Sequence, residues 1–157
     1  MTSDRYILPI WIATLSIVFF CFGIHIQAGS TEGIIGRVFY PFCHVNIFHL
    51  AGNLIALHSI SASAFRTDWK VFLTSYIISI AVPCSAPTEG MSGLLYAAMG
   101  ILSWQALYKW KFHLWCIGFM ALCFFFPQIN AMIHVWCYAL GIAIGYCSLV
   151  IDKWRKR

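Results

Sequence analysis

The stretch INAMIHVWCYALGIAIGYCSLVI, residues 129–151, contains no charged side chain and is followed directly by DKWRKR, residues 152–157. An α-helix needs about 20 apolar residues to cross the hydrocarbon core of a bilayer. Apolar and polar positions do not alternate along the stretch, which favours a helix over a strand of a membrane β-barrel. The stretch therefore predicts a membrane-spanning helix that ends in a basic tail.

The whole chain has the same apolar character. It has 157 residues, of which 61% are hydrophobic and 10% are charged. A soluble domain is about half apolar and about one quarter charged. So few charges could not cover a soluble surface, which argues against a soluble enzyme, a disordered chain and, despite the net charge of +5, a nucleic-acid-binding protein. The composition predicts an all-α membrane protein without a soluble domain.

Charged and turn residues divide the chain into six apolar stretches. The expected transmembrane helices are residues 6–27, 44–65, 69–84, 91–108, 112–126 and 129–151, in a single domain that covers residues 1–157. A Gly-rich loop over about residues 28–43 joins the first two helices. The first stretch exceeds the apolar part of a signal peptide, so we expect it to be retained as a span. The seven cysteines form no CxxC motif and lie mostly in apolar stretches, which predicts packing rather than disulfides.

The basic residues predict the orientation in the membrane. Six spans place both termini on one side. With the termini in the cytoplasm, only Arg37 among the basic residues lies outside. The cytoplasmic ones are Arg5, Arg66, Lys70, Lys109, Lys111, Lys153, Arg155, Lys156 and Arg157. This asymmetry agrees strongly with the positive-inside rule.

Carboxylates are missing from the interior of the predicted spans, where polar groups are costly. They occur only in loops or at span ends, as Asp4, Glu32, Asp68, Glu89 and Asp152, and no HExxH motif is present. This pattern excludes a proton relay built on Asp or Glu, an intramembrane aspartyl protease and a zinc protease of the HExxH type. Histidine, serine and asparagine remain as candidates for chemistry.

These remaining polar groups gather near the outer ends of three predicted spans. They are His44, His49 and Asn53 in the second span, Ser92 between Gly90 and Gly93 in the fourth, and His134 in the sixth. At 1.5 Å per residue, His49, Ser92 and His134 each lie roughly 25–28 Å from a basic residue at the other end of the helix. Because the hydrocarbon core is about 30 Å thick, we expect the three side chains at one depth, with Asn53 one turn deeper. The spacing leaves open whether they converge laterally.

A serine and a histidine at one depth suit acyl transfer, in which the histidine takes the serine proton and returns it to the leaving amine. His49, Asn53 and backbone amides at the start of helix 91–108 are candidate donors to the oxyanion. Without a carboxylate in a span, Ser92 and His134 would act as a dyad, and Tyr96 would orient the imidazole by packing.

Each of these residues also has a purely structural interpretation. Ser92 among glycines suits a packing or capping role, and Thr88 and Glu89 would then cap the same helix. Gly141 and Gly145 suit close packing of helix 129–151 against the small residues of helix 91–108. His134 and Cys137 together could form half of a metal site.

Three motifs together resemble the rhomboid intramembrane serine proteases. They are His44-x4-His49-x3-Asn53, Gly90-x-Ser92-Gly93-x2-Tyr96, and His134 seven residues before Gly141. The motifs occur in the order of that family, on the second, fourth and sixth helices, and the resemblance covers about residues 6–151. It implies a rhomboid-like bundle with Ser92 as the nucleophile and His134 as the general base.

The resemblance also implies roles for the neighbouring residues. Tyr96 would pack on the imidazole of His134. The oxyanion hole would come from His49, Asn53 and the Ser92 amide, with Gly90 in support. His44 would brace the first loop, and Gly93, Gly141 and Gly145 would be structural.

Single-span membrane proteins are the substrates that this resemblance implies, cleaved near the outer face without a cofactor, a metal or a nucleic-acid partner. The expected location is the lipid bilayer of the bacterial cytoplasmic membrane, with several passes. Two departures from the family pattern are the short loop 28–43, which lacks a Trp-Arg pair, and Cys137, where glycine is common. The second departure predicts looser packing of helix 129–151 against helix 91–108.

Two alternatives remain open from the sequence. One is a non-catalytic rhomboid-like protein that binds or escorts transmembrane helices. The other is a haem- or metal-binding bundle that uses His44, His49 and His134.

Overall fold

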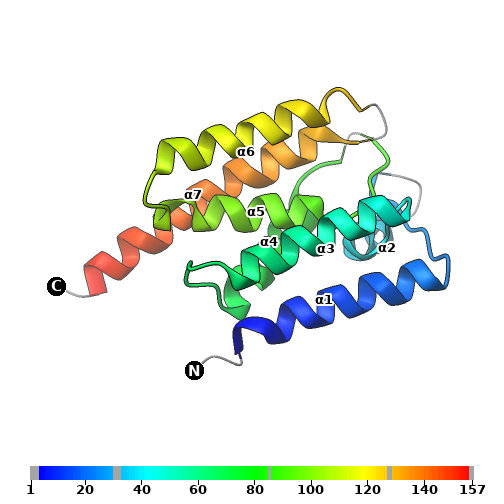
Figure 1. Cartoon of the computed structure of the whole chain (residues 1–157), viewed down its shortest axis with the longest axis horizontal. Helices are drawn as coiled ribbons and strands as arrows, with labels where there is room; N and C mark the ends of the chain where they lie inside the picture. Colours follow the sequence, from blue (N-terminus) through cyan, green and yellow to red (C-terminus); the bar gives the residue numbers. More distant parts are fainter. Residues whose placement is uncertain (1–3, 30–32, 85, 127–128, 156–157) are drawn as a thin grey trace.

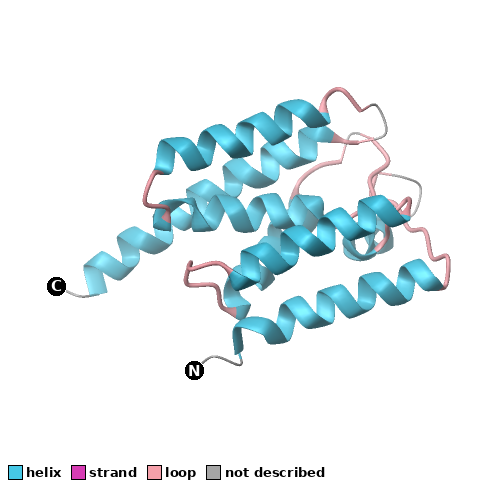
Figure 2. Cartoon of the chain, viewed as in Figure 1, coloured by secondary structure: helices cyan, strands magenta, loops and turns pink. Residues whose placement is uncertain are grey.

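The computed structural model describes residues 4–29, 33–84, 86–126 and 129–155. Apart from one isolated β-bridge, their regular structure is helical, which confirms the all-α class (Figure 2). The elements are α1 (Asp4–Cys21), α2 (Gly33–Phe39), η1 (Tyr40–Phe42), α3 (Ile47–Ala62), α4 (Trp69–Ala81), α5 (Ser92–Leu102), η2 (Ser103–Gln105), α6 (Lys109–Cys123) and α7 (Ala131–Arg155). Glu32, Lys156 and Arg157, which the sequence places in loops or the tail, lie outside the described residues.

Helices α1, α3, α4 and α5 are shorter than the predicted spans, whereas α6 has the predicted length and α7 is two residues longer. Local capping explains two of the starts. The Asn46 side chain accepts a hydrogen bond from the His49 amide at 2.9 Å and starts α3 at Ile47. Asp68 does the same for α4 through the Val71 amide at 3.1 Å. Side-chain oxygens at these positions satisfy amides that lack a partner within the helix. The prediction of a continuous loop over residues 28–43 was wrong, because this segment contains the helices α2 and η1.

Among the described helices, only α7 is long and apolar enough to cross a membrane by itself. The segment Gly33–Phe42 and α3 meet at a bend of 73° and would count together as one broken span. α4 is apolar but has only 13 residues. One such helix gives weak support for membrane association, and the helix lengths do not show several passes.

Helix α5 occupies the centre of the bundle, while α1 and α6 form opposite flanks (Figure 1). Eight of its eleven residues are buried. Glycines bring α7 against it, because a Cβ on Gly141 would overlap the carbonyl oxygen of Ala97, and one on Gly145 would lie 2.5 Å from that of Ile101. The expected close packing of both glycines on this helix is confirmed.

Cys137 does not loosen this α5–α7 interface, contrary to the expectation from the sequence. Its side chain is fully buried. A Cβ on Gly93 would lie 3.4 Å from the Cys137 sulfur, which is ordinary van der Waals contact. The thiol therefore fills the space that Gly93 leaves on the facing helix.

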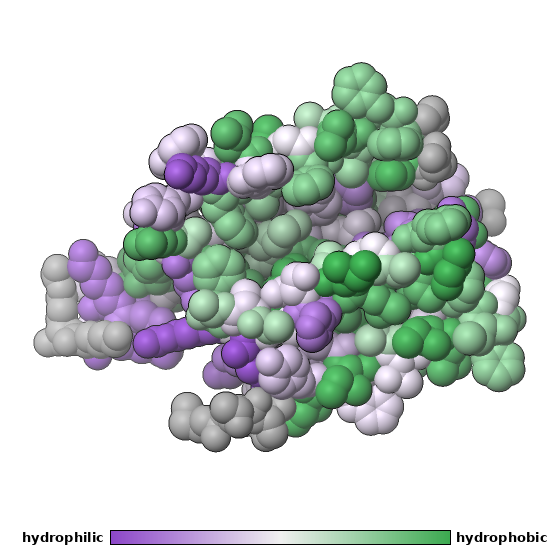
Figure 3. Space-filling model, viewed as in Figure 1, coloured by the Kyte–Doolittle hydropathy of each residue, from purple (hydrophilic) through white to green (hydrophobic). Residues whose placement is uncertain are grey.

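The start of α1 and the end of α7 lie at the same end of the bundle (Figure 1). Arg5 ties the start of α1 to the end of α3 by donating to the carbonyls of Ser61 and Ser63. Figure 3 shows hydrophilic residues gathered at this end and a largely hydrophobic surface elsewhere on the same face. Large apolar side chains such as Trp11, Phe48 and Trp115 are more than half exposed.

Candidate active site

The side chains of Ser92 and His134 are in contact. Ser92 is the first residue of α5, and its Oγ lies 2.8 Å from the Nε2 of His134 in the first turns of α7. The Tyr96 ring stacks on the imidazole with centroids 4.7 Å apart and planes at 26°. Tyr96 follows Ser92 by one helical turn, so both contacts arise from one face of α5. The structure thus brings together the predicted nucleophile, base and packing residue.

A tightly bound loop positions Ser92. Thr88 and Ala28 exchange two backbone hydrogen bonds of 3.0 Å, and the Gly90 amide donates to the Tyr40 carbonyl at 2.9 Å. The Asn130 side chain, just before α7, donates to the Thr88 hydroxyl at 2.8 Å. These contacts connect the loop before α5 with three other segments, so Ser92 and His134 are held together from both helix starts.

Thr88 and Glu89 do not cap α5, so this interpretation of the sequence was wrong. The cap residue is Met91, which offers no side-chain hydrogen bond. The Thr88 hydroxyl donates instead to the Ala86 carbonyl at 2.8 Å. Because Met91 offers no side-chain acceptor at the cap position, the first amides of α5 are candidate donors beside Ser92.

Two predicted oxyanion donors converge next to Gly90. A Cβ on Gly90, whose φ is 109°, would lie 2.5 Å from Cε1 of His49 and 3.4 Å from Nδ2 of Asn53. Asn53 is 7% exposed, and its buried Nδ2 has no hydrogen-bond partner among the described residues. An unpaired buried donor costs free energy unless something accepts from it. Gly90 therefore makes room for two side-chain donors close to the nucleophile.

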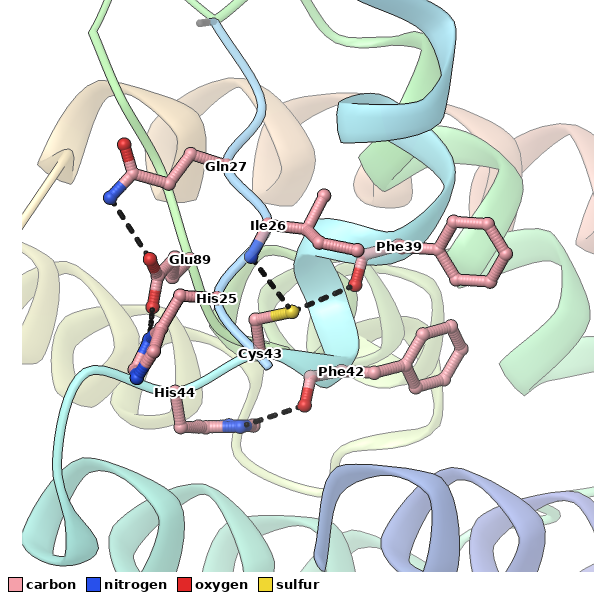
Figure 4. A network of polar contacts seen from close by, with 8 residues as sticks. All are labelled: His25, Ile26, Gln27, Phe39, Phe42, Cys43, His44 and Glu89. Atoms are coloured by element: carbon pink, nitrogen blue, oxygen red, sulfur yellow. Dashed lines mark hydrogen bonds and ion pairs between the residues drawn. The ribbon is translucent and has the colours of Figure 1, made fainter. Parts of the chain in front are cut away.

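His44 lies behind His49 and holds the preceding segment. Its Nδ1 donates to the Phe42 carbonyl at 3.3 Å (Figure 4). Its ring meets the His49 ring edge-on, with centroids 5.1 Å apart. The side chain is almost fully buried. This position agrees with the bracing role that the family resemblance implies, and it leaves His49 nearer to Ser92.

The site opens into a cavity of about 410 Å³ that is lined by Ser92, His134 and His49, together with several polar residues from the loops. One of them is Glu89, whose side chain is 3% exposed. Figure 4 shows its carboxylate between Gln27, which donates to it at 2.9 Å, and His25, which donates through Nδ1 at 3.2 Å. The carboxylate thus closes one side of the cavity.

Among the residues that the structure describes, no carboxylate accepts a hydrogen bond from His134. Its Nδ1 is buried and has no hydrogen-bond partner among the residues that the structure describes. Glu89 is the acidic residue that lines the cavity, and both of its oxygens are engaged elsewhere. The geometry is therefore that of a serine–histidine pair, with the Tyr96 ring as the neighbour that holds the imidazole.

Reasoning from the sequence missed Tyr40, Asn130 and the acceptor role of Glu89. Tyr40 is buried, and its hydroxyl donates to the Ser79 carbonyl at 3.0 Å. A Cβ on Gly93 would lie 3.2 Å from that hydroxyl, so Tyr40 packs directly on the start of α5. The apolar run at residues 38–42 was a signal that this part of the supposed loop is packed.

Within the described ranges, no group of three or more His, Cys, Asp or Glu side chains is arranged to hold a metal ion. His44 and His134 each use one ring nitrogen in a hydrogen bond to the protein. What the arrangement offers chemically is a serine hydroxyl, a base within hydrogen-bond distance and donors nearby, which are the parts needed for acyl transfer.

In comparisons with protein-family models, curated proteins and solved structures, none matches this chain. The resemblance to the rhomboid proteases therefore rests on the three sequence motifs. The contacts of His134 with Ser92 and Tyr96 are consistent with it.

Proposed function

We propose that this chain is a rhomboid-type intramembrane serine protease that cleaves single-span membrane proteins near the outer face of a bacterial cytoplasmic membrane. The observation that carries the proposal is the 2.8 Å contact between Ser92 Oγ and His134 Nε2 in a cavity that also contains His49. Serine hydroxyls are common in membrane helices, but packing alone does not require an imidazole within hydrogen-bond distance of such a hydroxyl.

In the proposed reaction, Ser92 Oγ attacks the carbonyl carbon of the scissile peptide and its proton passes to His134 Nε2. The oxyanion accepts hydrogen bonds from the Ser92 amide, His49 and Asn53. When the carbon–nitrogen bond breaks, His134 returns the proton to the leaving amine. Water then attacks the acyl-enzyme, with His134 as base again, and releases the new carboxyl terminus and the free serine.

The membrane arrangement is part of the proposal, with six passes through α1, α3, α4, α5, α6 and α7 and both termini in the cytoplasm. The short length of α5 suits this arrangement, because most of its residues are buried by the other helices and need not match the bilayer thickness. The loop before it would line a water-filled cavity, which is where irregular backbone is tolerated at membrane depth. Water would reach Ser92 from the outer face.

The direct test is to incubate the purified protein with a single-span reporter and follow the two fragments. We expect Ser92→Ala and His134→Ala each to abolish cleavage. The matched control is Ser103→Ala, which changes a buried serine at the other end of α5 whose hydroxyl bonds to the Gly100 carbonyl. Equal cleavage by the wild type and Ser92→Ala would refute the proposal.

The oxyanion donors give a graded effect. Loss of one such donor typically lowers the rate by about 10²–10³-fold. We therefore expect His49→Ala and Asn53→Ala to retain weak cleavage with the correct fragment sizes. His58→Ala, which removes an exposed histidine from the same helix, should cleave at the wild-type rate.

A non-catalytic helix-binding protein of rhomboid type is the competing function. A fluorophosphonate probe separates the two, because it labels a serine only when a base activates it. Labelling of the wild type that disappears in both Ser92→Ala and His134→Ala supports the protease. Reporter binding without labelling or cleavage supports the binding protein.

A further inference from the structure

A second cavity, of about 810 Å³, lies at the opposite end of α5 from Ser92. It is an open cavity bordered by the start of α4, by η2 with the end of α5, and by the last turns of α7. The cations Arg66, Lys70 and Lys153 line it, and Ile101, Trp104 and Leu149 supply apolar walls. A volume of this size falls in the range of small-molecule sites, about 300–1,000 Å³.

We infer that this basic cavity binds the phosphate headgroup of an anionic glycerophospholipid from the cytoplasmic leaflet. The inference rests on the membrane arrangement proposed above, although not on the protease chemistry. Basic pockets between membrane helices on the cytoplasmic side are a general mode of anionic headgroup binding. The charges and walls of this cavity favour that ligand over a soluble anion.

Charge is the first argument. Two acidic residues, Asp68 and Asp152, line the cavity beside its three cations. An oxygen of Asp68 is already engaged as the cap of α4. In the described part of the chain, no ion pair joins either acid to Arg66, Lys70 or Lys153. An excess of cations without ionic partners suits an incoming anion, and the positive end of the α4 dipole adds to it.

The apolar walls are the second argument. The Trp104 indole donates to the Ile142 carbonyl at 2.8 Å, and a Cβ on Gly145 would lie 2.8 Å from its ring. This fixed indole gives the cavity a rigid apolar wall next to α7. Acyl chains would use such a surface, whereas a soluble phosphate has no need of it.

The position of the cavity is the third argument. Trp69, which is 46% exposed, and Trp154, which is 72% exposed, lie close in sequence to the lining cations. Tryptophan is enriched at the membrane–water interface. Hydrophilic residues also gather at this end of the molecule (Figure 3). The cavity therefore lies where headgroups are expected.

Native mass spectrometry of the full chain in detergent, titrated with phosphatidylglycerol or phosphatidylcholine, tests the inference. We expect tighter binding of phosphatidylglycerol, and a roughly 10- to 100-fold loss of it in Arg66→Gln/Lys70→Gln/Lys153→Gln. The matched control is Lys109→Gln/Lys111→Gln/Arg155→Gln, which removes the same charge at the same end from residues outside the cavity lining. Equal loss in both variants, or no loss in the first, would overturn the inference.

A variant with the opposite effect guards against misfolding of the triple variant. Asp152→Asn removes an acid from the cavity lining, so phosphatidylglycerol should bind several-fold more tightly. Weaker or unchanged binding would contradict the inference. Soluble glycerol phosphate should not displace the lipid at equal concentration, and displacement would identify a soluble anion as the ligand instead.

Labelling of Ser92 by the fluorophosphonate probe in the same preparations separates this inference from the protease proposal. Labelling with no preference for phosphatidylglycerol overturns only the lipid site. A preference for phosphatidylglycerol without labelling counts against the protease and leaves the lipid site supported.

Discussion

Helices α5 and α6 are both apolar, yet α5 is mostly buried in the bundle and α6 is mostly exposed. In α5, eight of eleven residues are buried, whereas in α6 only Cys116 and Met120 are buried among fifteen. The glycines differ in the same way. A Cβ on Gly100 of α5 would overlap the Tyr138 carbonyl oxygen, while one on Gly118 of α6 would meet nothing within 4 Å.

This difference shows that hydropathy predicts which segments form apolar helices. The positions of small residues determine which of these helices pack closely together. In the proposed membrane arrangement, helices in lipid would have no large hydrophobic driving force to associate, so close van der Waals packing would decide the partner. The α5–α7 interface has facing glycines along its length, and it carries Ser92 and His134. α6 is tied to α7 by contacts such as the 2.7 Å hydrogen bond between His113 Nδ1 and the Tyr138 hydroxyl.

The largest effect is expected where the α5–α7 interface is tightest. Gly141→Val would force its Cβ into the Ala97 carbonyl and should destabilise the fold by about 3 kcal/mol or more. Probe labelling of Ser92 should also disappear, because the two helices must separate. The measurement is the thermal unfolding midpoint in detergent. Gly118→Val is the matched control in α6, and an equal shift in both variants would show that packing does not distinguish the helices.

Cys137→Gly tests the same interface by removing contacts. The variant leaves a gap next to Gly93 and adds a helical glycine, which together should cost about 2 kcal/mol. Cys147→Gly, at an exposed position of the same helix, should cost only the conformational entropy of a helical glycine. Chemical denaturation of both variants measures the difference, and identical midpoints would mean that the buried thiol contributes nothing.

Gly118→Ala should increase the stability of the fold, whereas the two preceding variants should decrease it. Its site is open, so the alanine removes conformational freedom of the unfolded chain without a clash and should stabilise the protein by about 0.5–1 kcal/mol. An increase of the thermal midpoint is the expected readout. A decrease would mean that α6 is packed more closely than its open glycine indicates.

Tyr138→Phe should have the smallest effect on stability and a local effect on α6. It removes the hydroxyl that bonds to His113, and such bonds between membrane helices average about 0.6 kcal/mol. Amide hydrogen exchange should become faster in α6 and stay unchanged in α5. Tyr146→Phe, at an exposed tyrosine of α7, is the control. Unchanged hydrogen exchange in α6 would mean that contacts other than the His113–Tyr138 hydrogen bond hold α6 against α7.

Much of the site could be predicted from residue spacing, since Ser92 and Tyr96 share a helix face and the distances to basic residues predict one depth for Ser92 and His134. Their contact could not be predicted in this way, because depth says nothing of lateral position. The contacts of the loop before α5 could not be predicted from residue spacing either. Thr88 pairs with Ala28 and Asn130, which are distant in the chain, and such pairs leave no local pattern.

By itself, the sequence determined the helical class, the apolar surface and the glycines and polar residues available for contacts. These properties follow from composition and from spacing along one helix. Tertiary structure decided that α5 is the central helix, that Glu89 turns to His25 and Gln27 rather than to His134, and that the basic residues at the other end surround a cavity. The reason is physical, because each of these outcomes depends on how segments that are distant in the chain approach one another. That approach is set by the side chains of all these segments at once.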